Sequence, residues 1–378
     1  MNGEEYFSQT LRQLAESGRL RSIPQGTPAG VVDLASNDYL GLAESPQLAD
    51  DFLAGTDINA AMLTSSASRL LAPRQDAYAR LEAVIDSLYG RSSLLFNSGY
   101  HANVGIVSAL ADRHTLVIAD RLVHASVIDG LRMSGARFER FAHNDCQHLE
   151  RLISRAGGSA DRILVIVESV YSMDGDCADL QALADIKRRY PRVMLYVDEA
   201  HAVGVCGPGG LGAVQSLPDP AVADIVVGTL GKALASAGAY VVCSPVMREY
   251  LVNFSRSLIF STALPPLQVL WSSYILERVT QMDDRREHLR QLARRLSGYT
   301  GAAPSHIQPL ITGSAASAVA LSQHLLTLGY KVLPIRTPTV PPGTERLRFS
   351  LSAAIDTDRL DRLVAAKDQS QNIVYAGF

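Results

Sequence analysis

Three residues that could act together in catalysis follow two apolar segments in the middle of the chain. Residues 193–197 precede Asp198 and His201, and residues 225–227 precede the segment GTLGK, which ends at Lys232. Short apolar runs of this kind are typical of buried strands. The three side chains would then lie at the carboxyl edge of a parallel sheet, which is where α/β proteins bind their ligands.

A carboxylate, an imidazole and an amine at this edge suit an aromatic cofactor that is held by its ring nitrogen and bonded to an amine. Pyridoxal phosphate is such a cofactor. Asp198 would keep the pyridine nitrogen protonated, which makes the ring an electron sink. Lys232 would bond to the cofactor aldehyde, and its released amine would be the acid and base beside the substrate Cα. His201 could reach the phenolic oxygen of the ring.

Other interpretations of this region explain fewer residues. Residues 198–201, DEAH, spell a box found in helicases, but the upstream phosphate loop GxxxxGK[ST] that a helicase needs is missing. Residues 207–212 match GxGxxG, yet Pro208 removes an amide donor and no strand immediately precedes the segment, so we expect a loop. A metal site formed by Cys206 with the DEAH acid and histidine would lack further ligands, and we predict no metal.

The elements that must position these groups alternate along the chain. Alternating strands and helices predict an α/β fold with a mostly parallel sheet. We expect strands at 93–96, 115–119, 137–141, 163–168, 193–197, 225–227 and 239–243, and helices at 6–20, 75–89, 124–134 and 180–189. We predict a large cofactor domain with a sheet of the seven-stranded type at 46–266, preceded by an N-terminal helix and extended segment at 1–45.

Residues 267–378 are predicted to form a connecting helix, at 267–296, and a smaller α+β domain. That domain would contain a strand near 307–311, a helix at 315–328 and a last helix that begins after the cap Asp356. In residues 345–352 apolar and polar residues alternate, so Arg346 and Arg348 would share one face. An arginine on a rigid strand could bind a carboxylate, or the strand could simply be exposed.

Two further segments could bind a ligand. Residues 97–100 follow a strand and open a helix, and free amides at a helix N-terminus can bind a phosphate, although an ordinary turn is equally compatible. Tyr100 could cover a flat ring. Asn37 could use its amide on a ligand or on its own backbone, and Arg21 could lie at a solvated helix end.

Composition narrows the class of protein. The 378 residues carry a formal net charge of −3, which argues against bulk nucleic-acid binding. No apolar run approaches the roughly 18 to 20 residues that span a bilayer, and the N-terminus lacks an apolar signal core, so we expect a cytoplasmic protein. The four cysteines are widely spaced and are interpreted as core thiols: Cys146, Cys177, Cys206 and Cys243.

Segments along nearly the whole chain resemble the α-oxoamine synthases, fold-type I pyridoxal phosphate enzymes that condense an amino acid with an acyl thioester and release carbon dioxide. They are SNDYLGL from Ser36, LLFNSGYHAN from Leu94, DRLVHAS from Asp120, RFAHND from Arg140, ESVYSMDGDCADL from Glu168, VDEAHAVGVCGPGGLG from Val197, GTLGKAL from Gly228, STALPP from Ser261, IQPLI from Ile307 and IRTPTVPPGTERLRFSLSAA from Ile335. The last two resemble most the member of biotin synthesis, which implies L-alanine and a pimeloyl thioester, on coenzyme A or acyl carrier protein, as substrates.

The resemblance implies a role for each matching residue. Lys232 would hold the cofactor, Asp198 would pair with the ring nitrogen and His201 would contact the phenolic oxygen. His124 would stack on the ring. Further cofactor contacts would come from Gly99, Tyr100, Ser172, Thr229 and, across a homodimer interface, Ser261 and Thr262. Substrate contacts would come from Arg21, Asn37, Thr339 and Arg348, the last with the amino acid carboxylate.

Two departures from the family pattern stand out. Residues 64–69, TSSASR, lack the glycines that relatives usually have there, and Ala202 follows the DEAH box where the family often has Gly or Ser. A relative that uses glycine or another acyl-CoA is an alternative within the family. A non-catalytic partner subunit is a second alternative, against which the joint presence of Lys232, Asp198 and His201 argues.

Overall fold

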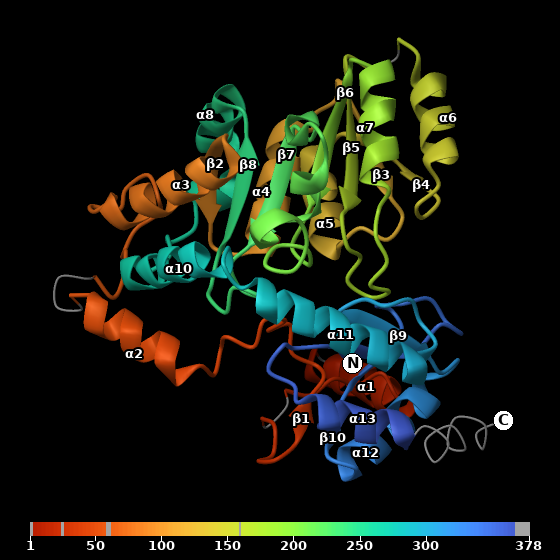
Figure 1. Ribbon diagram of the computed structural model, residues 1–378. Helices are drawn as coiled ribbons and strands as arrows, with labels where there is room; N and C mark the ends of the chain where they lie inside the picture. The colour runs from red at the N-terminus through yellow and green to blue at the C-terminus, as the bar shows by residue number, and fades with distance from the viewer. Residues whose placement is uncertain (1–2, 24–25, 58–61, 159, 367–378) are drawn as a thin grey trace. The chain divides into compact units, whose positions relative to one another are not determined.

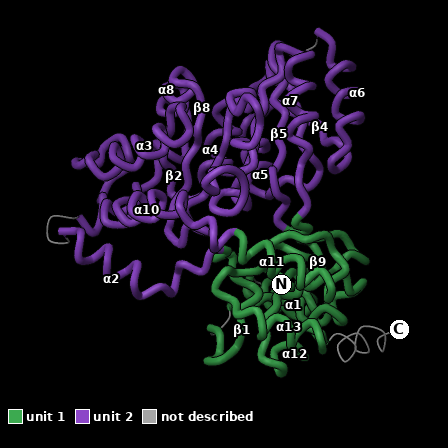
Figure 2. Tube along the Cα trace, in the orientation of Figure 1, with its two compact units in different colours: residues 1–39, 173–175, 287–378 green, residues 40–172, 176–286 purple. Residues whose placement is uncertain are grey.

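The computed structural model describes residues 3–23, 26–57, 62–158 and 160–366. The chain divides into two compact units, shown in Figure 2. Unit 1 contains residues 1–39, 173–175 and 287–378, and unit 2 contains residues 40–172 and 176–286. The predicted boundaries after residues 45 and 266 stay a prediction, and residues 367–378 of the predicted last domain lie outside the described residues.

Unit 2 is built around a seven-stranded sheet in the order β2-β8-β7-β6-β5-β3-β4. The neighbours from β7 to β4 pair in parallel, whereas β8 pairs antiparallel with both β2 and β7. The predicted mostly parallel sheet is therefore confirmed. The strands are β2 (Ser92–Phe96), β3 (Thr115–Asp120), β4 (Arg137–Phe141), β5 (Arg162–Glu168), β6 (Val193–Asp198), β7 (Ile225–Thr229) and β8 (Ala239–Cys243).

Helices cover both faces of this sheet (Figure 1), which is why its inner strands are apolar at nearly every position. Helices α4 (Gly99–Leu110) and α5 (Ala125–Ser134) lie on one face, and α6 (Cys146–Ala156) and α7 (Leu180–Arg189) lie on the other. The chain runs along the sheet in one direction up to β4 and then reverses. Right-handed crossovers put the helices of the two directions on opposite faces.

The remaining helices of unit 2 lie near the two ends of its sequence. They are α2 (Pro46–Gly55), α3 (Asp76–Tyr89), α8 (Pro245–Phe254), α9 (Arg256–Ile259) and α10 (Pro266–Val279), with short 3₁₀ turns at Pro208–Gly210, Ala213–Ser216 and Pro220–Val222. The GxGxxG match at 207–212 thus forms a loop with a 3₁₀ turn, as predicted.

The single helix predicted for 267–296 is wrong. The structure has two helices, α10 and α11 (Asp283–Thr300), with a break between them. The buried guanidinium of Arg286 donates to the carbonyl oxygens of Val279 (2.7 Å) and Thr280 (3.3 Å) and pairs with Asp283 (2.8 Å). These bonds satisfy carbonyls at the end of α10, so the helix can stop without a glycine or proline.

Unit 1 contains a three-stranded antiparallel sheet in the order β11-β12-β9 and a short parallel pair, β1 with β10. Asp356 caps the last helix by accepting from the backbone N–H of Asp358 at 2.7 Å, as predicted. The elements are β1 (Val32–Asp33), β9 (Ile307–Ile311), β10 (Tyr330–Lys331), β11 (Leu333–Ile335), β12 (Arg346–Ser350), α1 (Gly3–Glu16), α12 (Ala315–Thr327) and α13 (Thr357–Ala365).

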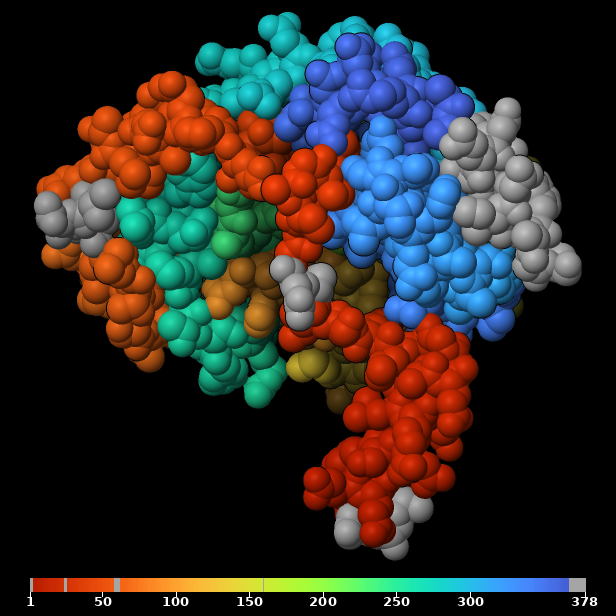
Figure 3. All heavy atoms as spheres, turned by 90° about the horizontal axis from the view of Figure 1, so that it is seen from below, coloured from red at the N-terminus to blue at the C-terminus, as the bar shows by residue number. Residues whose placement is uncertain are grey.

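Several predictions about burial need correction. Helix α1, in the red segment of Figure 3, ends at Glu16, before the predicted Leu20, and buries no residue, and its Tyr6, Phe7 and Leu11 are exposed. Cys177 is exposed, and of the four cysteines Cys243 is buried, so the description of all four as core thiols is wrong. The arginines of β12 are buried, which rules out an exposed strand. Within the described ranges, no helix is both long and apolar enough to cross a membrane.

Candidate active site

The centre of the candidate site is a contact between Lys232 and His201 in unit 2. Lys232 Nζ lies 2.6 Å from His201 Nε2. Lys232 follows β7 and His201 follows β6, which is the adjacent parallel strand. Because the carboxyl ends of parallel strands meet at one edge, the fold itself brings these two groups together. At this distance one nitrogen donates and the other accepts.

Asp198 is the last residue of β6 and is 5% exposed. Its Oδ1 accepts from the backbone N–H of Ala200 at 2.9 Å, and its Oδ2 accepts from Asn103 Nδ2 at 2.7 Å. The Asn103 side chain also donates to Ser126 Oγ at 2.9 Å and accepts from the Tyr196 hydroxyl at 2.5 Å. The backbone N–H of Ala200 and the side chain of Asn103 on α4 therefore fix the orientation of the Asp198 carboxylate.

His124 is the N-cap of α5. Its Nδ1 accepts from the backbone N–H of Ser126 at 3.2 Å and lies 2.7 Å from the Ser126 hydroxyl. Burial lowers the pKa of His124. The charge of Asp198 opposes this shift, and the charge of Lys232 adds to it. A neutral ring held by α5 beside Asp198 and Lys232 is compatible with the predicted stacking role.

A second carboxyl, Glu168, lies beside Asp198. The two residues are register partners at the ends of β5 and β6, and Glu168 is 2% exposed. Burial, and secondarily the charge of Asp198, raise the pKa of Glu168 to about 8. The charge of Lys232 and the backbone N–H groups of His124 and Ser172 act in the opposite direction.

The structure also allows a test of whether the chain fits pyridoxal phosphate. At the N-terminus of α4, Ser98 caps the helix by accepting from His101 N at 3.2 Å, and a side chain added at Gly99 would meet no atom within 4 Å. The space beside Gly99 is thus open, and the first N–H groups of a helix, which have no acceptor within the helix, suit a phosphate. Together with the amine of Lys232 and the carboxylate of Asp198, these donors and acceptors fit the cofactor.

The other residues predicted to contact the cofactor are held by neighbours in unit 2. The Thr229 hydroxyl donates to Gly238 O at 3.2 Å, and Tyr100 donates to Asp129 Oδ2 at 2.8 Å. Thr262 contacts Asn97 through its backbone carbonyl. The predicted contacts of Ser261 and Thr262 across a dimer stay predictions.

The loop that lacks glycine adopts a strained conformation. Ser66 has a φ of 52°, in the left-handed region that glycine adopts more readily. The next turn of the chain is anchored, because Ser68 forms a β-bridge with Thr262. The altered sequence TSSASR therefore keeps a left-handed residue in this loop.

The predicted substrate residues form two pairs in unit 1. Arg348 is 5% exposed, and its Nη2 donates to Asn37 Oδ1 at 3.1 Å. Arg21 Nη2 donates to Thr339 Oγ1 at 3.0 Å. Residues more than 300 positions apart in sequence are thus brought into contact within each pair.

The second acid of the DEAH segment, Glu199, is enclosed by the protein. Glu199 is fully buried and accepts from the backbone N–H of Val214 at 3.0 Å. Burial raises its pKa to about 7. A side chain at Gly212, which has a φ of +100°, would lie 1.8 Å from Glu199 Oε2. The last glycine of the GxGxxG match is therefore needed for close packing on Glu199.

Sequence reasoning missed the residues that support the site. Asn103 lies one turn inside α4, Ser126 lies in the first turn of α5, and Glu168 lies at the end of β5 without a predicted role. Asn103 and Ser126 belong to the matching segments LLFNSGYHAN and DRLVHAS. Their place inside these matching segments was the available signal.

Comparisons with known proteins agree with this geometry. Residues 29–366 match the family model of aminotransferase class I and II. The 8-amino-7-oxononanoate synthase of Haemophilus ducreyi is 44% identical over 383 residues, covering 95% of this chain and 99% of the relative.

Solved structures are similar over most of their length. A lysine-to-alanine variant of serine palmitoyltransferase from S. paucimobilis, with a bound PLP–myriocin aldimine, has a TM-score of 0.89 and 26% identity, covering 98% of both chains. The 8-amino-7-oxononanoate synthase of Francisella tularensis has a TM-score of 0.74 and 27% identity, covering 92% of this chain and 97% of that one.

The predicted fold-type I architecture is confirmed. The chain belongs to the aminotransferase class I and II family, in the group of the 8-amino-7-oxononanoate synthases.

Proposed function

We propose that this protein is a pyridoxal 5'-phosphate-dependent acyltransferase of biotin biosynthesis that condenses L-alanine with a pimeloyl thioester to give 8-amino-7-oxononanoate. The observation that carries the proposal is the contact of Lys232 Nζ with His201 Nε2, at 2.6 Å, beside the oriented carboxylate of Asp198. Membership of the synthase group supplies the choice of reaction.

The site geometry and the family resemblance support a set of residues that would hold the cofactor. Asp198 would pair with the ring nitrogen, the amides of Gly99 and Tyr100 would bind the phosphate, and Lys232 would bond to the aldehyde. His124 would lie against the ring, and His201 would contact its phenolic oxygen. Ser172, Thr229 and Thr262 complete the proposed set. When bound, the cofactor withdraws electrons from the Cα of the amino acid.

Lys232 is the proposed proton carrier. Its amine would take the proton from the alanine Cα and later return a proton to the same carbon. His201 lies within hydrogen-bond distance of this amine and can stabilise either protonation state. Over the whole reaction the alanine Cα bonds to the thioester carbonyl carbon, the thiol leaves and the alanine carboxylate departs as carbon dioxide.

Substrate recognition is assigned to residues of unit 1. Arg348 would bind the carboxylate of alanine with two N–H groups, and Asn37, which accepts from Arg348, would fix the guanidinium. Arg21 and Thr339 would contact the acyl thioester. The proposal further includes a homodimer, a cytoplasmic location, and either coenzyme A or an acyl carrier protein as the acyl donor.

The test combines chemical labelling with product analysis. Borohydride reduction of the wild-type protein with bound cofactor should attach pyridoxal phosphate to the peptide that contains Lys232, as detected by mass spectrometry. Lys232→Ala should lose both this label and turnover. Label on another lysine, such as Lys331, or turnover by Lys232→Ala would refute the assignment.

A second candidate is a family member that uses another amino acid, because the serine palmitoyltransferase is similar to this chain with a TM-score of 0.89. Parallel assays with L-alanine, glycine and L-serine, each with pimeloyl-CoA and palmitoyl-CoA, separate the candidates. We expect product from L-alanine and pimeloyl-CoA. Faster turnover of serine or glycine would favour the second candidate.

A further inference from the structure

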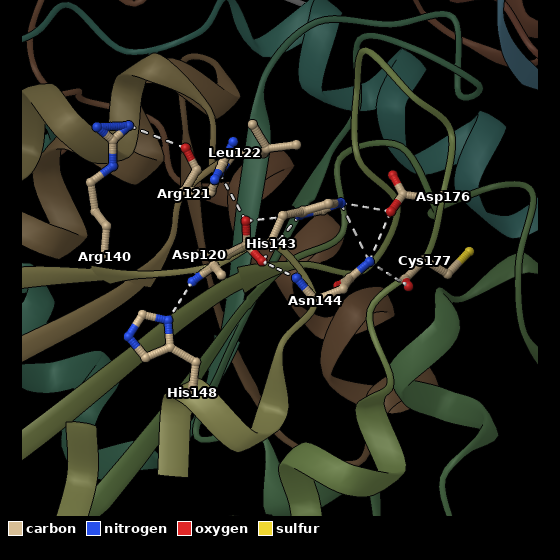
Figure 4. Close-up of polar contacts among 10 residues, drawn as sticks. Asp120, Arg121, Leu122, Arg140, His143, Asn144, His148, Asp176 and Cys177 are labelled. Carbon is tan, nitrogen blue, oxygen red and sulfur yellow. Dashed lines mark hydrogen bonds and ion pairs between the residues drawn. The ribbon is translucent and has the colours of Figure 1, made fainter. Parts of the chain in front are cut away.

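A charged cluster outside the candidate site joins three segments of unit 2 (Figure 4). Asp120, at the end of β3, is fully buried and accepts from the backbone N–H groups of Leu122 at 2.8 Å and Asn144 at 2.9 Å. His143 follows β4 and lies between Asp120 and Asp176, which follows β5. Its Nδ1 is 3.0 Å from Asp120 Oδ1, and its Nε2 is 2.7 Å from Asp176 Oδ2.

The contacts of His143 define its charge. Both ring nitrogens face carboxylate oxygens, which accept hydrogen bonds, so both nitrogens must carry a proton. Asp176 Oδ2 also accepts from Asn144 Nδ2 at 2.8 Å. Burial alone would lower the pKa of His143, but the hydrogen bonds and charges of Asp120 and Asp176 outweigh it and raise the pKa to about 10.

The other groups around the His143 ring do not compete for its two protons. Tyr171 packs edge-on against His143, with ring centroids 4.4 Å apart, and burial raises the pKa of this phenol, which stays neutral. His148 Nδ1 accepts from the backbone N–H of Ala142 at 3.0 Å and is engaged there. Arg140 points its guanidinium to Arg121 O at 3.1 Å.

The two aspartates belong to segments that lead to proposed cofactor residues. Four positions after Asp120 comes His124, the cap of α5. Ser172 lies in the segment between Val170 and Cys177, which is closed by a β-bridge and by a bond from Tyr171 N to Asp176 O at 2.9 Å. The backbone N–H groups of His124 and Ser172 both act on Glu168. The two segments are therefore joined at Glu168 and again through His143.

We propose that His143 is a positioning residue whose imidazolium joins Asp120 to Asp176 and thereby holds His124 and Ser172 in the geometry that binds pyridoxal phosphate. The inference rests on the proposed function, since that function places both residues at the cofactor. His143 itself contacts neither the cofactor cluster nor Lys232 in the bonds described above.

The charge of the ring can be measured without any activity. In protein labelled with ¹⁵N-histidine, the ring of His143 should carry protons on both nitrogens at pH 8. His148 is the internal control, because its Nδ1 accepts a hydrogen bond from the Ala142 N–H and should therefore carry no proton. A singly protonated His143 ring at pH 8 would overturn the proposal.

The positioning role is tested with Asp176→Asn, which keeps the size of the side chain and removes one charge. The ring should then lose its Nε2 proton at pH 8, and the Kd for pyridoxal phosphate should rise roughly tenfold, as expected for one charged hydrogen bond. The increase in this Kd of the variant over that of the wild type should become larger between pH 6 and pH 9. A purely structural role would not produce this pH dependence. His114→Gln, at an exposed histidine, is the matched control and should bind as the wild type does.

The outcomes separate this inference from the proposed function. Wild-type affinity and wild-type pH dependence in Asp176→Asn would refute the positioning role. Failure of the wild-type protein to bind pyridoxal phosphate at all would refute the proposed function and, with it, the positioning role, whereas the ring measurement would still report the charge of His143.

Discussion

Replacing Asn103 with alanine tests whether α4 holds the Asp198 carboxylate. The Asn103 side chain is 2% exposed, donates to Asp198 Oδ2 at 2.7 Å and accepts from the Tyr196 hydroxyl at 2.5 Å. A hydrogen bond to a charged group contributes about 1.5–3 kcal/mol, and an unpaired buried hydroxyl costs about 1–3 kcal/mol. We therefore expect Asn103→Ala to lower the free energy of unfolding by about 3 kcal/mol, measured by urea denaturation.

The same change should weaken cofactor binding. Asp198 without its Asn103 donor can rotate, so its pairing with the pyridine nitrogen would be less well oriented. A loss of about 1.4 kcal/mol corresponds to a tenfold higher Kd. We expect at least this increase for pyridoxal phosphate, measured by titration of the visible absorbance of the bound cofactor.

The matched control is Asn253→Ala on α8. Asn253 is exposed, and its amide donates to the carbonyl of Glu249 at 2.8 Å, so we expect a change within about 0.5 kcal/mol. Wild-type stability in Asn103→Ala would refute the energetic reasoning. Lower stability with unchanged cofactor affinity would show that Asn103 stabilises the fold without orienting Asp198.

The remaining predictions concern backbone strain, a cap and a buried acid. Ser66→Gly should raise the free energy of unfolding by about 0.5 kcal/mol, because the relief of left-handed strain at φ 52° exceeds the added chain entropy. Gly212→Ala should destabilise by about 2 kcal/mol or more, since the new Cβ would lie 1.8 Å from Glu199 Oε2. Asp356→Ala should cost about 1 kcal/mol in the same urea assay by removing the cap of α13. Glu168 has a pKa raised from 4.5 to about 8, so the folded chain keeps a proton that the unfolded chain releases. This difference makes the free energy of unfolding fall as pH rises from 4.5 to about 8. Urea unfolding curves of Glu168→Gln across this pH range should show a smaller fall than those of the wild type.

The strands of unit 2 could be predicted from sequence because they are buried on both faces. A strand covered by helices on each side must be apolar at successive positions, as in β7 and β8, and such runs are visible without any alignment. The cap Asp356 was visible for a similar reason, since its effect depends on residues next to it in sequence.

The end of α10 could not be predicted in this way. The carbonyls that end the helix are bonded by Arg286, several residues further along the chain, and no glycine or proline marks the break. The burial of Arg346 and Arg348 was equally hidden, because it depends on partners distant in sequence. Arg346 pairs with Asp174, and Arg348 contacts Asn37.

The residues of the candidate site also divide into those that the sequence predicts and those that it does not. Asp198, His201 and Lys232 were recognisable because each lies at or just after the end of a strand, and the parallel sheet brings strand ends together. Asn103 reaches Asp198 from a helix on one face of the sheet. Such a contact depends on how α4 packs and rotates, which hydrophobic periodicity does not fix to within one hydrogen bond.

The pair of carboxyls at the ends of β5 and β6 illustrates what the structure adds. From sequence, Glu168 and Asp198 are equivalent acids after equivalent strands, and either could serve a cationic ring nitrogen. Their register makes them neighbours, and two like charges in one buried place are unfavourable. Both acids accept two hydrogen bonds, Asp198 from Asn103 and Ala200 and Glu168 from the backbone N–H groups of His124 and Ser172, but burial raises the pKa of Glu168 to about 8. Burial therefore favours a proton on Glu168 at neutral pH, and Asp198, which the Asn103 and Ala200 donors orient, is the acid that a protonated ring nitrogen can use.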